Sequence, residues 1–432
     1  MELRERLRLA LQPGAEPALG GATPSSAPRP AIPVLPSRPL DAGLCCALPL
    51  QRIETGGGAV YLAEEWWPLD YRHGRLALGD ALSLDGPALS RLEPGLSASD
   101  LGDAAFVDVE TTGLAGGTGT YVFLVGLGTF EDSAFRLRQF FLADLGREAA
   151  MLAAIAEALA GCRALVSFNG RQFDLPLLET RLTLSRLPAL APDLPHLDLL
   201  YPARRLYRRR LSSCRLASLE EALLGLERED DVPGWAIPPL YFDYLRRGEV
   251  GPLRTVFRHN ALDILSLVAL LAHLGHIMGG DLPADPDDCV ALARWDETEG
   301  RLADAGRLYA AALDGGVDGE GRALALRRLA RLYRRLGRWE DAARLWREEA
   351  ENGGAPERRL EALIELAKLE EHRRRDYATA AAVTRRALSL VELLTLRGGG
   401  QTIPWLRREA LEHRLWRLRR RLASGSFRSG EL

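Results

Sequence analysis

The feature that most constrains this chain is a short apolar segment, residues 104–110, that carries carboxylates at Asp108 and Glu110. Its apolar start predicts a strand buried in a sheet. Side chains two residues apart on a strand project from the same face, so both carboxylates point to one place. Like charges that close repel and raise each other's pKa, and a divalent cation relieves both effects. Together with the glycine-rich segment 116–119, the pattern favours a metal site over a solvated strand edge.

Length and composition exclude several classes of protein. A chain of 432 residues is too long for one hydrophobic core and predicts two or three domains. A net charge of -3 gives no global basic field, so any nucleic-acid surface has to be local. Five cysteines without a CxxC pair or a ligand-like spacing favour reduced thiols and argue against zinc. We find neither a signal-peptide core nor a run of about 18 apolar residues, so we expect a cytoplasmic protein with no membrane segment.

Composition and periodicity divide the chain into four parts. Residues 1–50 combine a short amphipathic helix with a flexible linker rich in proline and alanine. Residues 51–100 contain strand-like pieces and are expected to form a small β-rich lead-in. Residues 101–280 hold three strands joined by short turns and then alternating helices and strands, which predicts a mixed α/β sheet with helices on its faces. From residue 281 to 432 the pattern is wholly helical.

The helical part repeats itself. The segments that begin at Gly300, Gly337 and Arg375 align with one another, at offsets of 37 and 38 residues. Each unit is a helix, a turn and a second helix around a small alanine, which resembles tetratricopeptide repeats of a slightly long period. Three units are about the minimum for a self-supporting stack. We therefore expect an all-α tetratricopeptide-like repeat domain that binds a protein partner and ends in a basic C-terminal helix.

Two further acids stand in contexts that suit a ligand site. Asp174 follows the apolar segment 164–168 and opens a helix, and ligands of open α/β sheets bind at strand ends. A simple helix N-cap remains the alternative for Asp174. Asp263 lies on a mostly apolar helix, an expensive place for an unpaired carboxylate. His259 precedes it by four residues, so the two side chains share one helix face.

Together these motifs resemble those of the DEDD exonucleases, which have the ribonuclease H-like fold. The motifs are Asp-x-Glu at 108–110, Asn-x-x-x-Phe-Asp at 169–174, and His259 ahead of Asp263. The chain resembles still more closely the bacterial YprB-type proteins, which join such a domain to C-terminal tetratricopeptide repeats. Segments 116–121, 196–200 and 213–216 also fit that family, and the resemblance runs from about residue 51 to the last repeat.

The resemblance implies a metal-dependent 3′→5′ exonuclease that acts on single-stranded DNA or RNA. Its two Mg²⁺ or Mn²⁺ ions would be held by Asp108, Glu110, Asp174 and Asp263. His259 would orient or deprotonate the attacking water. The family's histidine branch, however, places its histidine five residues before the last acid, where this chain has Arg258. A structural role for His259 therefore stays open.

Substrate contacts are expected in two places. The resemblance assigns the strand end to the backbone at Thr111 and Thr112, with Leu114 against the terminal base and Asn169 supporting the site. Separately, residues 201–215 carry six arginines, no acids and two tyrosines, a composition that suits phosphate contact and base stacking. The candidate binding residues there are Arg204, Arg205 and Arg208. A solvated helix face is the alternative for this stretch.

Two other functions remain compatible with the sequence. A non-catalytic adaptor would bind nucleic-acid ends with the same fold and recruit partners through its repeats. A structure-selective endonuclease would keep the metals and change only the substrate. The complete set of four acids favours an enzyme over the adaptor.

Overall fold

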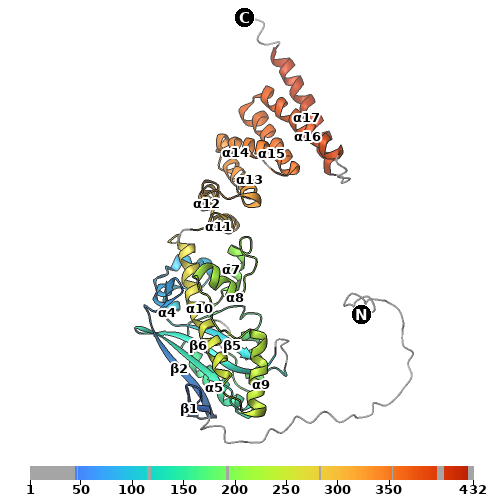
Figure 1. The fold of residues 1–432 in the computed structure, drawn as a ribbon. Helices are drawn as coiled ribbons and strands as arrows, with labels where there is room; N and C mark the ends of the chain where they lie inside the picture. Colours follow the sequence, from blue (N-terminus) through green and yellow to red (C-terminus); the bar gives the residue numbers. More distant parts are fainter. Residues whose placement is uncertain are drawn as a thin grey trace, which may run out of the picture. The chain divides into compact units, whose positions relative to one another are not determined.

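The computed structural model describes residues 44, 45, 47–113, 118–190, 194–281, 284–352, 354–396 and 403–426. The expected N-terminal helix and most of the linker after it lie outside these residues, as do Leu114 and the glycines at 116 and 117. The described chain consists of a mixed sheet with helices around it, followed by paired helices (Figure 1).

A seven-stranded mixed sheet forms the centre of the first part, in the order β1-β2-β7-β6-β5-β8-β9. Its strands are β1 (Leu50–Thr55), β2 (Gly58–Pro68), β5 (Ala104–Thr111), β6 (Val122–Glu131), β7 (Ala134–Phe141), β8 (Ala164–Ser167) and β9 (His196–Asp198). The predicted antiparallel meander of β5, β6 and β7 is confirmed, and β8 and β9 add to it in parallel. The segment expected as a β-rich lead-in gives β1 and β2 to this same sheet.

The sheet is buried on both faces, as its apolar strands require. Successive residues of β5 enter different cores: Phe106 packs in the core built around α10 (Leu253–Gly279), and Val107 packs with α5 (Glu148–Leu159) on the other face. A small sheet of β3 (Arg72–His73) and β4 (Leu76–Ala77) lies apart from it. The mixed α/β sheet with helices on its faces is therefore confirmed.

The helices of this part frame the sheet. Besides α5 and α10 they are α3 (Gly86–Leu92), α4 (Ala98–Gly102), α6 (Asp174–Leu184), α7 (Leu200–Tyr207), α8 (Leu216–Leu219) and α9 (Ile237–Arg247). Short helical turns complete them: η1 (Leu78–Ser83), η2 (Leu145–Arg147), η3 (Glu220–Leu224) and η4 (Gly234–Ala236). By length and composition α10 is also apolar enough to cross a membrane, but 78% of its most apolar window is buried inside the structure. That burial makes it weak evidence for a membrane span.

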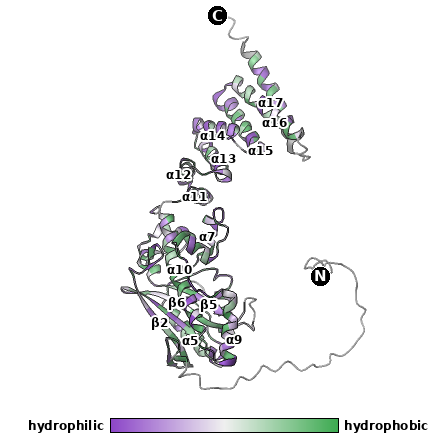
Figure 2. Ribbon diagram, in the orientation of Figure 1, coloured by the Kyte–Doolittle hydropathy of each residue, from purple (hydrophilic) through white to green (hydrophobic). Residues whose placement is uncertain are grey.

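The second part is a succession of helices, each packed on the next. They are α11 (Pro286–Thr298), α12 (Leu302–Asp314), α13 (Gly319–Arg335), α14 (Trp339–Asn352), α15 (Pro356–Leu369), α16 (Tyr377–Leu396) and α17 (Ile403–Ser426), with the turn η5 (Glu370–Arg374) before α16. Their shared core is rich in leucine and alanine. Figure 2 shows hydrophilic and hydrophobic stretches alternating along α13 to α15, whereas β6 and α10 are mainly hydrophobic.

Helix α11 belongs to two cores at once. Its Leu292 and Trp295 pack into the core around α10, while Val290 packs into the helical core that follows. On the α10 side, the Arg205 guanidinium of α7 lies 4.0 Å from the centre of the Trp295 ring. Nearby, Arg210 makes two hydrogen bonds, of 2.9 and 3.0 Å, with the carboxylate of Asp288. The first helix after residue 281 is thus attached to the sheet domain by apolar and ionic contacts.

Candidate active site

The two carboxylates of β5 lie where α10 crosses the sheet. Asn260 of α10, fully buried, donates from Nδ2 to Asp108 Oδ2 at 2.8 Å. Its Oδ1 accepts a hydrogen bond of 2.9 Å from Gln139 Nε2 on β7. Asp108 pairs with Gly126 of β6, and a Cβ at Gly126 would lie 2.4 Å from Asn260 Oδ1. Glycine is therefore required there for α10 to approach the strand that carries the acids.

Asp174 is brought to the site by the loop that follows β8. Asp198, buried at the end of β9, accepts backbone hydrogen bonds from Asn169 at 2.7 Å and Arg171 at 3.1 Å, which fixes this loop. At Gly170 a Cβ would lie 2.4 Å from Ser167 Oγ and 3.1 Å from Asp174 Oδ2, so glycine lets the turn close. Asp174 is the first residue of α6, and Phe173 before it holds the N-cap position.

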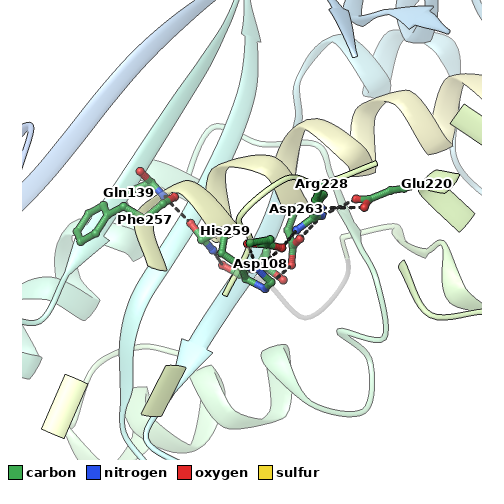
Figure 3. Close-up of polar contacts among 9 residues, drawn as sticks. Asp108, Gln139, Glu220, Arg228, Phe257, His259 and Asp263 are labelled. Atoms are coloured by element: carbon green, nitrogen blue, oxygen red, sulfur yellow. Dashed lines mark hydrogen bonds and ion pairs between the residues drawn. The ribbon is translucent and has the colours of Figure 1, made fainter. Parts of the chain in front are cut away.

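The acid on α10 is not alone. Arg228 Nη2 lies 2.5 Å from Asp263 Oδ1, and the same guanidinium makes an ion pair with the buried Glu220. Arg228 Nη1 also lies 3.0 Å from Asp231 Oδ2. His259 contacts both acids, with Nδ1 2.9 Å from Asp231 and Nε2 3.6 Å from Asp263 Oδ2. Figure 3 shows this network running along α10 from Gln139 to Glu220.

Three of the four predicted metal ligands have pKa values raised by burial and by neighbouring acids. Burial and then the charges of Asp263, Glu110 and Asp174 raise the pKa of Asp108 well above its usual range. The pKa of Glu110 is raised well above its usual range in the same way, first by burial and then by Asp263 and Asp174. For Asp174, burial and the charges of Asp198 and Asp263 raise the pKa to about 7. These carboxylates are therefore gathered closely enough to repel one another.

Asp263 differs because a cation offsets part of this repulsion. Burial raises its pKa, while the charge of Arg228 and that of His259 act to lower it. Burial also acts to raise the pKa of Asp231, but the His259 hydrogen bond and Arg228 outweigh it and lower the pKa overall. The pKa of Asp263 on α10 is therefore raised, whereas the pKa of Asp231, which contacts α10 through His259, is lowered.

This donor set fits hard divalent cations. Carboxylate oxygens are the ligands that Mg²⁺ and Mn²⁺ prefer. Asp108, Glu110 and Asp174 make no ion pair with a basic residue in the part of the chain that the structure describes, so a cation would relieve the repulsion that raises their pKa values. No three histidine, cysteine or acidic side chains among the described residues converge into a ready-made metal cage.

The expected substrate residues fall into separate places. Thr111 and Thr112 close the turn after β5, through Thr111 Oγ1 to Gly113 O at 2.9 Å and Tyr121 N to Thr112 Oγ1 at 2.9 Å. Asn169 has a left-handed φ of 66°, which asparagine tolerates, in the loop that leads to Asp174. Two expected residues, Arg204 and Arg208, are exposed on α7 and the turn after it.

Arg205, although adjacent to Arg204, serves a different contact. Its Nη2 hydrogen-bonds Thr298 Oγ1 at 2.5 Å, and its guanidinium lies over Trp295. Arg205 is therefore engaged with α11. All three candidate arginines are nevertheless exposed.

Sequence reasoning missed Glu220, Arg228 and Asp231. All three come from the segment between α8 and α9, where residues 227–231 are consecutively charged. Such a run ordinarily indicates a solvated loop. Nothing in the sequence shows that Arg228 and Asp231 turn inward, since their partners on α10 lie 28 to 35 residues further on.

Comparison with known proteins identifies the sheet domain. Residues 105–275 match the family model of the RNase_H superfamily. This part of the chain is an RNase H-like domain. Members of this superfamily generally use divalent metal ions, in agreement with the donor set of the site. All four predicted metal ligands lie within the matched residues.

A relative is found among curated proteins. The chain is 34% identical over 243 residues to the uncharacterized protein YprB of Bacillus subtilis (strain 168). The aligned region covers 54% of this chain and 58% of the relative, so the chain spans less than two thirds of that protein's length. The predicted resemblance to YprB-type RNase H-like proteins with C-terminal helical repeats is thereby confirmed.

Proposed function

We propose that this protein is a metal-dependent exonuclease that removes nucleotides from the 3′ end of single-stranded nucleic acid. The observation that carries the proposal is the gathering of four carboxylates from three elements of an RNase H-like domain, where burial and the charge of Asp263 raise the pKa values of Asp108, Glu110 and Asp174. Carboxylates gathered at such a cost to stability indicate a site for cations.

The four carboxylates would hold two Mg²⁺ or Mn²⁺ ions. When bound, such ions supply an activated water and stabilise negative charge on the phosphate and the leaving oxygen. His259 would accept the proton of the attacking water at Nε2, the nitrogen that faces Asp263. Asn260 would keep Asp108 in place through its 2.8 Å hydrogen bond. The buried amide thus sets the direction of a ligand oxygen.

A single strand would reach the site along α7. Tyr201, Arg204 and Arg208 follow one another at helical spacing and are all exposed. Tyr201 accepts a hydrogen bond of 3.2 Å from Gln172, in the loop that carries Asp174. An aromatic ring with two arginines beside it offers stacking and phosphate contacts that need no particular base sequence. At the strand end, the turn at Thr111 and Thr112 with Leu114 would hold the last nucleotide, and Asn169 would support it.

The helices after residue 281 would provide a second function. Stacked helical pairs present extended surfaces to peptides and proteins. We propose that they recruit a protein partner in the cytoplasm, while hydrolysis takes place in the RNase H-like domain.

A panel of 5′-labelled DNA and RNA oligonucleotides with Mn²⁺ tests this function. A ladder of products that shortens from the 3′ end is expected, and it should disappear both in EDTA and in the Asp108→Asn variant. His259→Ala should slow the reaction by about 10²- to 10⁴-fold, the usual range for a lost general base. Internal cuts would indicate an endonuclease instead, and retarded but intact oligonucleotides would indicate a binding adaptor.

A further inference from the structure

The imidazole of His259 is held on the side away from the metal ligands. Its Nδ1 lies 2.9 Å from both carboxylate oxygens of Asp231. The two side chains are 17% and 19% exposed, so water competes little for this contact. Asp231 comes from the segment before α9 and His259 from α10, so only the tertiary fold pairs them.

Asp231 is in turn fixed by Arg228. The guanidinium reaches Asp231 Oδ2 at 3.0 Å through Nη1, and its Nε donates to Glu220 at 2.8 Å. Glu220 is only 1% exposed and begins the π-helical turn η3, so the anchor of this chain of contacts is buried. Because Arg228 also contacts Asp263, the loop and α10 are joined at two points.

We propose that Asp231 is a positioning residue that keeps the proton of the neutral His259 ring on Nδ1 and so leaves Nε2 free to accept a proton at the metal site. An ionised carboxylate only accepts hydrogen bonds, so the nitrogen that faces it has to carry the hydrogen. In a neutral imidazole the other nitrogen is then the acceptor. This assignment rests on the proposed nuclease function, in which His259 acts as the base.

The geometry also explains how a histidine four residues before Asp263 can serve. On α10 this spacing places Nε2 of His259 3.6 Å from Asp263 Oδ2, next to one of the four predicted metal ligands. A contact at Nε2 alone would leave the His259 ring free to rotate about χ1 and χ2. Asp231 supplies the second contact, at Nδ1. The orientation of the base is therefore set by the loop, not by helical spacing alone.

The ring nitrogens of His259 test the proposal directly, without turnover. In metal-free, full-length protein labelled with ¹⁵N-histidine, we expect the Nδ1–H tautomer of His259 at alkaline pH. Asp231→Asn should lose this preference, because an amide can donate or accept at Nδ1, whereas Asp231→Glu should keep it. The matched control is Asp281→Asn, which alters the exposed pair between His276 and Asp281 (3.2 Å) and should leave the His259 signals unchanged. An unchanged Nδ1–H signature in Asp231→Asn would overturn the proposal.

Kinetics provide the second test. Asp231→Asn should lower kcat by about 10- to 100-fold, as is usual when a supporting partner is removed, with KM and the Kd for Mn²⁺ unchanged. In a His259→Ala background the same substitution should cost less than about two-fold, because a residue that acts through His259 has nothing left to act on. An additive loss in the double variant would show that Asp231 acts otherwise. If the wild type hydrolyses no oligonucleotide, the proposed function fails, while the tautomer measurement still decides the role of Asp231.

Discussion

Acidic side chains are withdrawn from solvent in two regions of this protein, and the two regions differ in whether a basic side chain pairs with each acid. Where α11 meets the sheet domain, Asp288 is paired with Arg210, and Asp296 is paired with both Arg91 and Arg301. In the candidate active site, Asp108 and Glu110 are crowded by other acids, and neither forms an ion pair with a described basic residue. Asp288 and Asp296 are buried and Asp108 and Glu110 are half-buried, so the two regions differ in exposure as well as in partners.

The difference separates acids with a structural role from the acids for which we propose a role in catalysis. A buried ion pair that is complete can be kept for structure, since removing one partner leaves the other charge stranded. Carboxylates that raise each other's pKa lower the stability of the metal-free fold, and such groups cluster at functional sites. Asp263 stands between the two cases, because Arg228 offsets its charge while it faces the other acids.

The largest effect is expected from neutralising one acid of the active site. Asp108→Asn keeps an oxygen that can accept the Asn260 hydrogen bond but removes a metal-ligating charge. Hydrolysis should fall by at least about 10³-fold. The melting temperature in EDTA should stay the same or rise, because one repulsive charge is gone. An active variant, or one that melts clearly earlier than the wild type in EDTA, would mean that Asp108 belongs with the structural acids.

The opposite outcome is expected at the junction with α11. Asp296→Asn leaves Arg91 and Arg301 without their shared partner, and should lower the free energy of unfolding by about 1 to 3 kcal/mol. Urea denaturation measures this loss, and the rate per folded molecule on a short oligonucleotide should not change. The control is Asp304→Asn, which breaks an exposed pair with Arg307 and should change stability by less than about 0.5 kcal/mol. Equal effects of the two variants would contradict a structural role for the α11 contact.

Metal binding should make the active-site acids behave like the paired ones, and the gain should depend on pH. Because the folded pKa of Asp174 is raised from 3.8 to about 7, the unfolded chain releases this proton first as pH rises. The free energy of unfolding of the metal-free protein should therefore fall between pH 4 and 7 through this group. Mn²⁺ should then raise the melting temperature more at about pH 8 than at about pH 5.5, since the ligand carboxylates have to be ionised to bind it.

The contribution of Asp174 has to be separated from that of buried histidines. Burial lowers the pKa of His73, His196 and His273 to about 4, so the unfolded chain takes up protons there as pH falls below 6.5 and stability falls with it. Comparing Asp174→Asn with the wild type cancels this opposing effect. Without metal, the melting temperature of Asp174→Asn should exceed that of the wild type by more as pH rises. A difference that does not change with pH would show that the pKa of Asp174 is not raised.

The smallest effect concerns Arg204, Arg205 and Arg208, of which Arg205 packs on Trp295 of α11. Removing one phosphate contact with a single strand lowers the slope of log K against log salt by about 0.7. Arg204→Ala and Arg208→Ala should each lower the slope by this amount. Arg205→Ala should leave the slope unchanged and lower thermal stability, because its guanidinium packs on Trp295. Binding of a labelled oligonucleotide at several salt concentrations distinguishes the three variants.

How much the sequence predicts follows from how local each signal is. The strands 104–110 and 164–168, and the acids on them or after them, are visible because period and composition are properties of neighbouring residues. The pairing of Arg228 with Asp263 is invisible, because a charged run has no sign of turning inward. Adjacent arginines such as Arg204 and Arg205 look alike in sequence, and only the packing of α11 separates their roles.

The boundary near residue 281 illustrates the same limit. The change of periodicity there marks where helical pairs begin, and the boundary placed at that point remains a prediction. The change of periodicity does not indicate whether the first helix packs on the sheet domain or on the helices that follow. In the structure, Trp295 of α11 lies in the core of α10, a contact that no local pattern encodes.

Helix α10 runs from the candidate active site to the contact with α11, and this limits how its sequence can evolve. Asn260 and Asp263 stand near its start, while towards its end His273 meets the Tyr207 hydroxyl at 3.0 Å and Met278 O accepts a hydrogen bond from Arg91, the partner of Asp296. A residue inserted or deleted between them would turn one end by about 100° against the other. We therefore expect homologues to tolerate substitutions along α10 but to keep the number of residues between Asn260 and Met278. Insertions and deletions should be confined to the loops outside this helix.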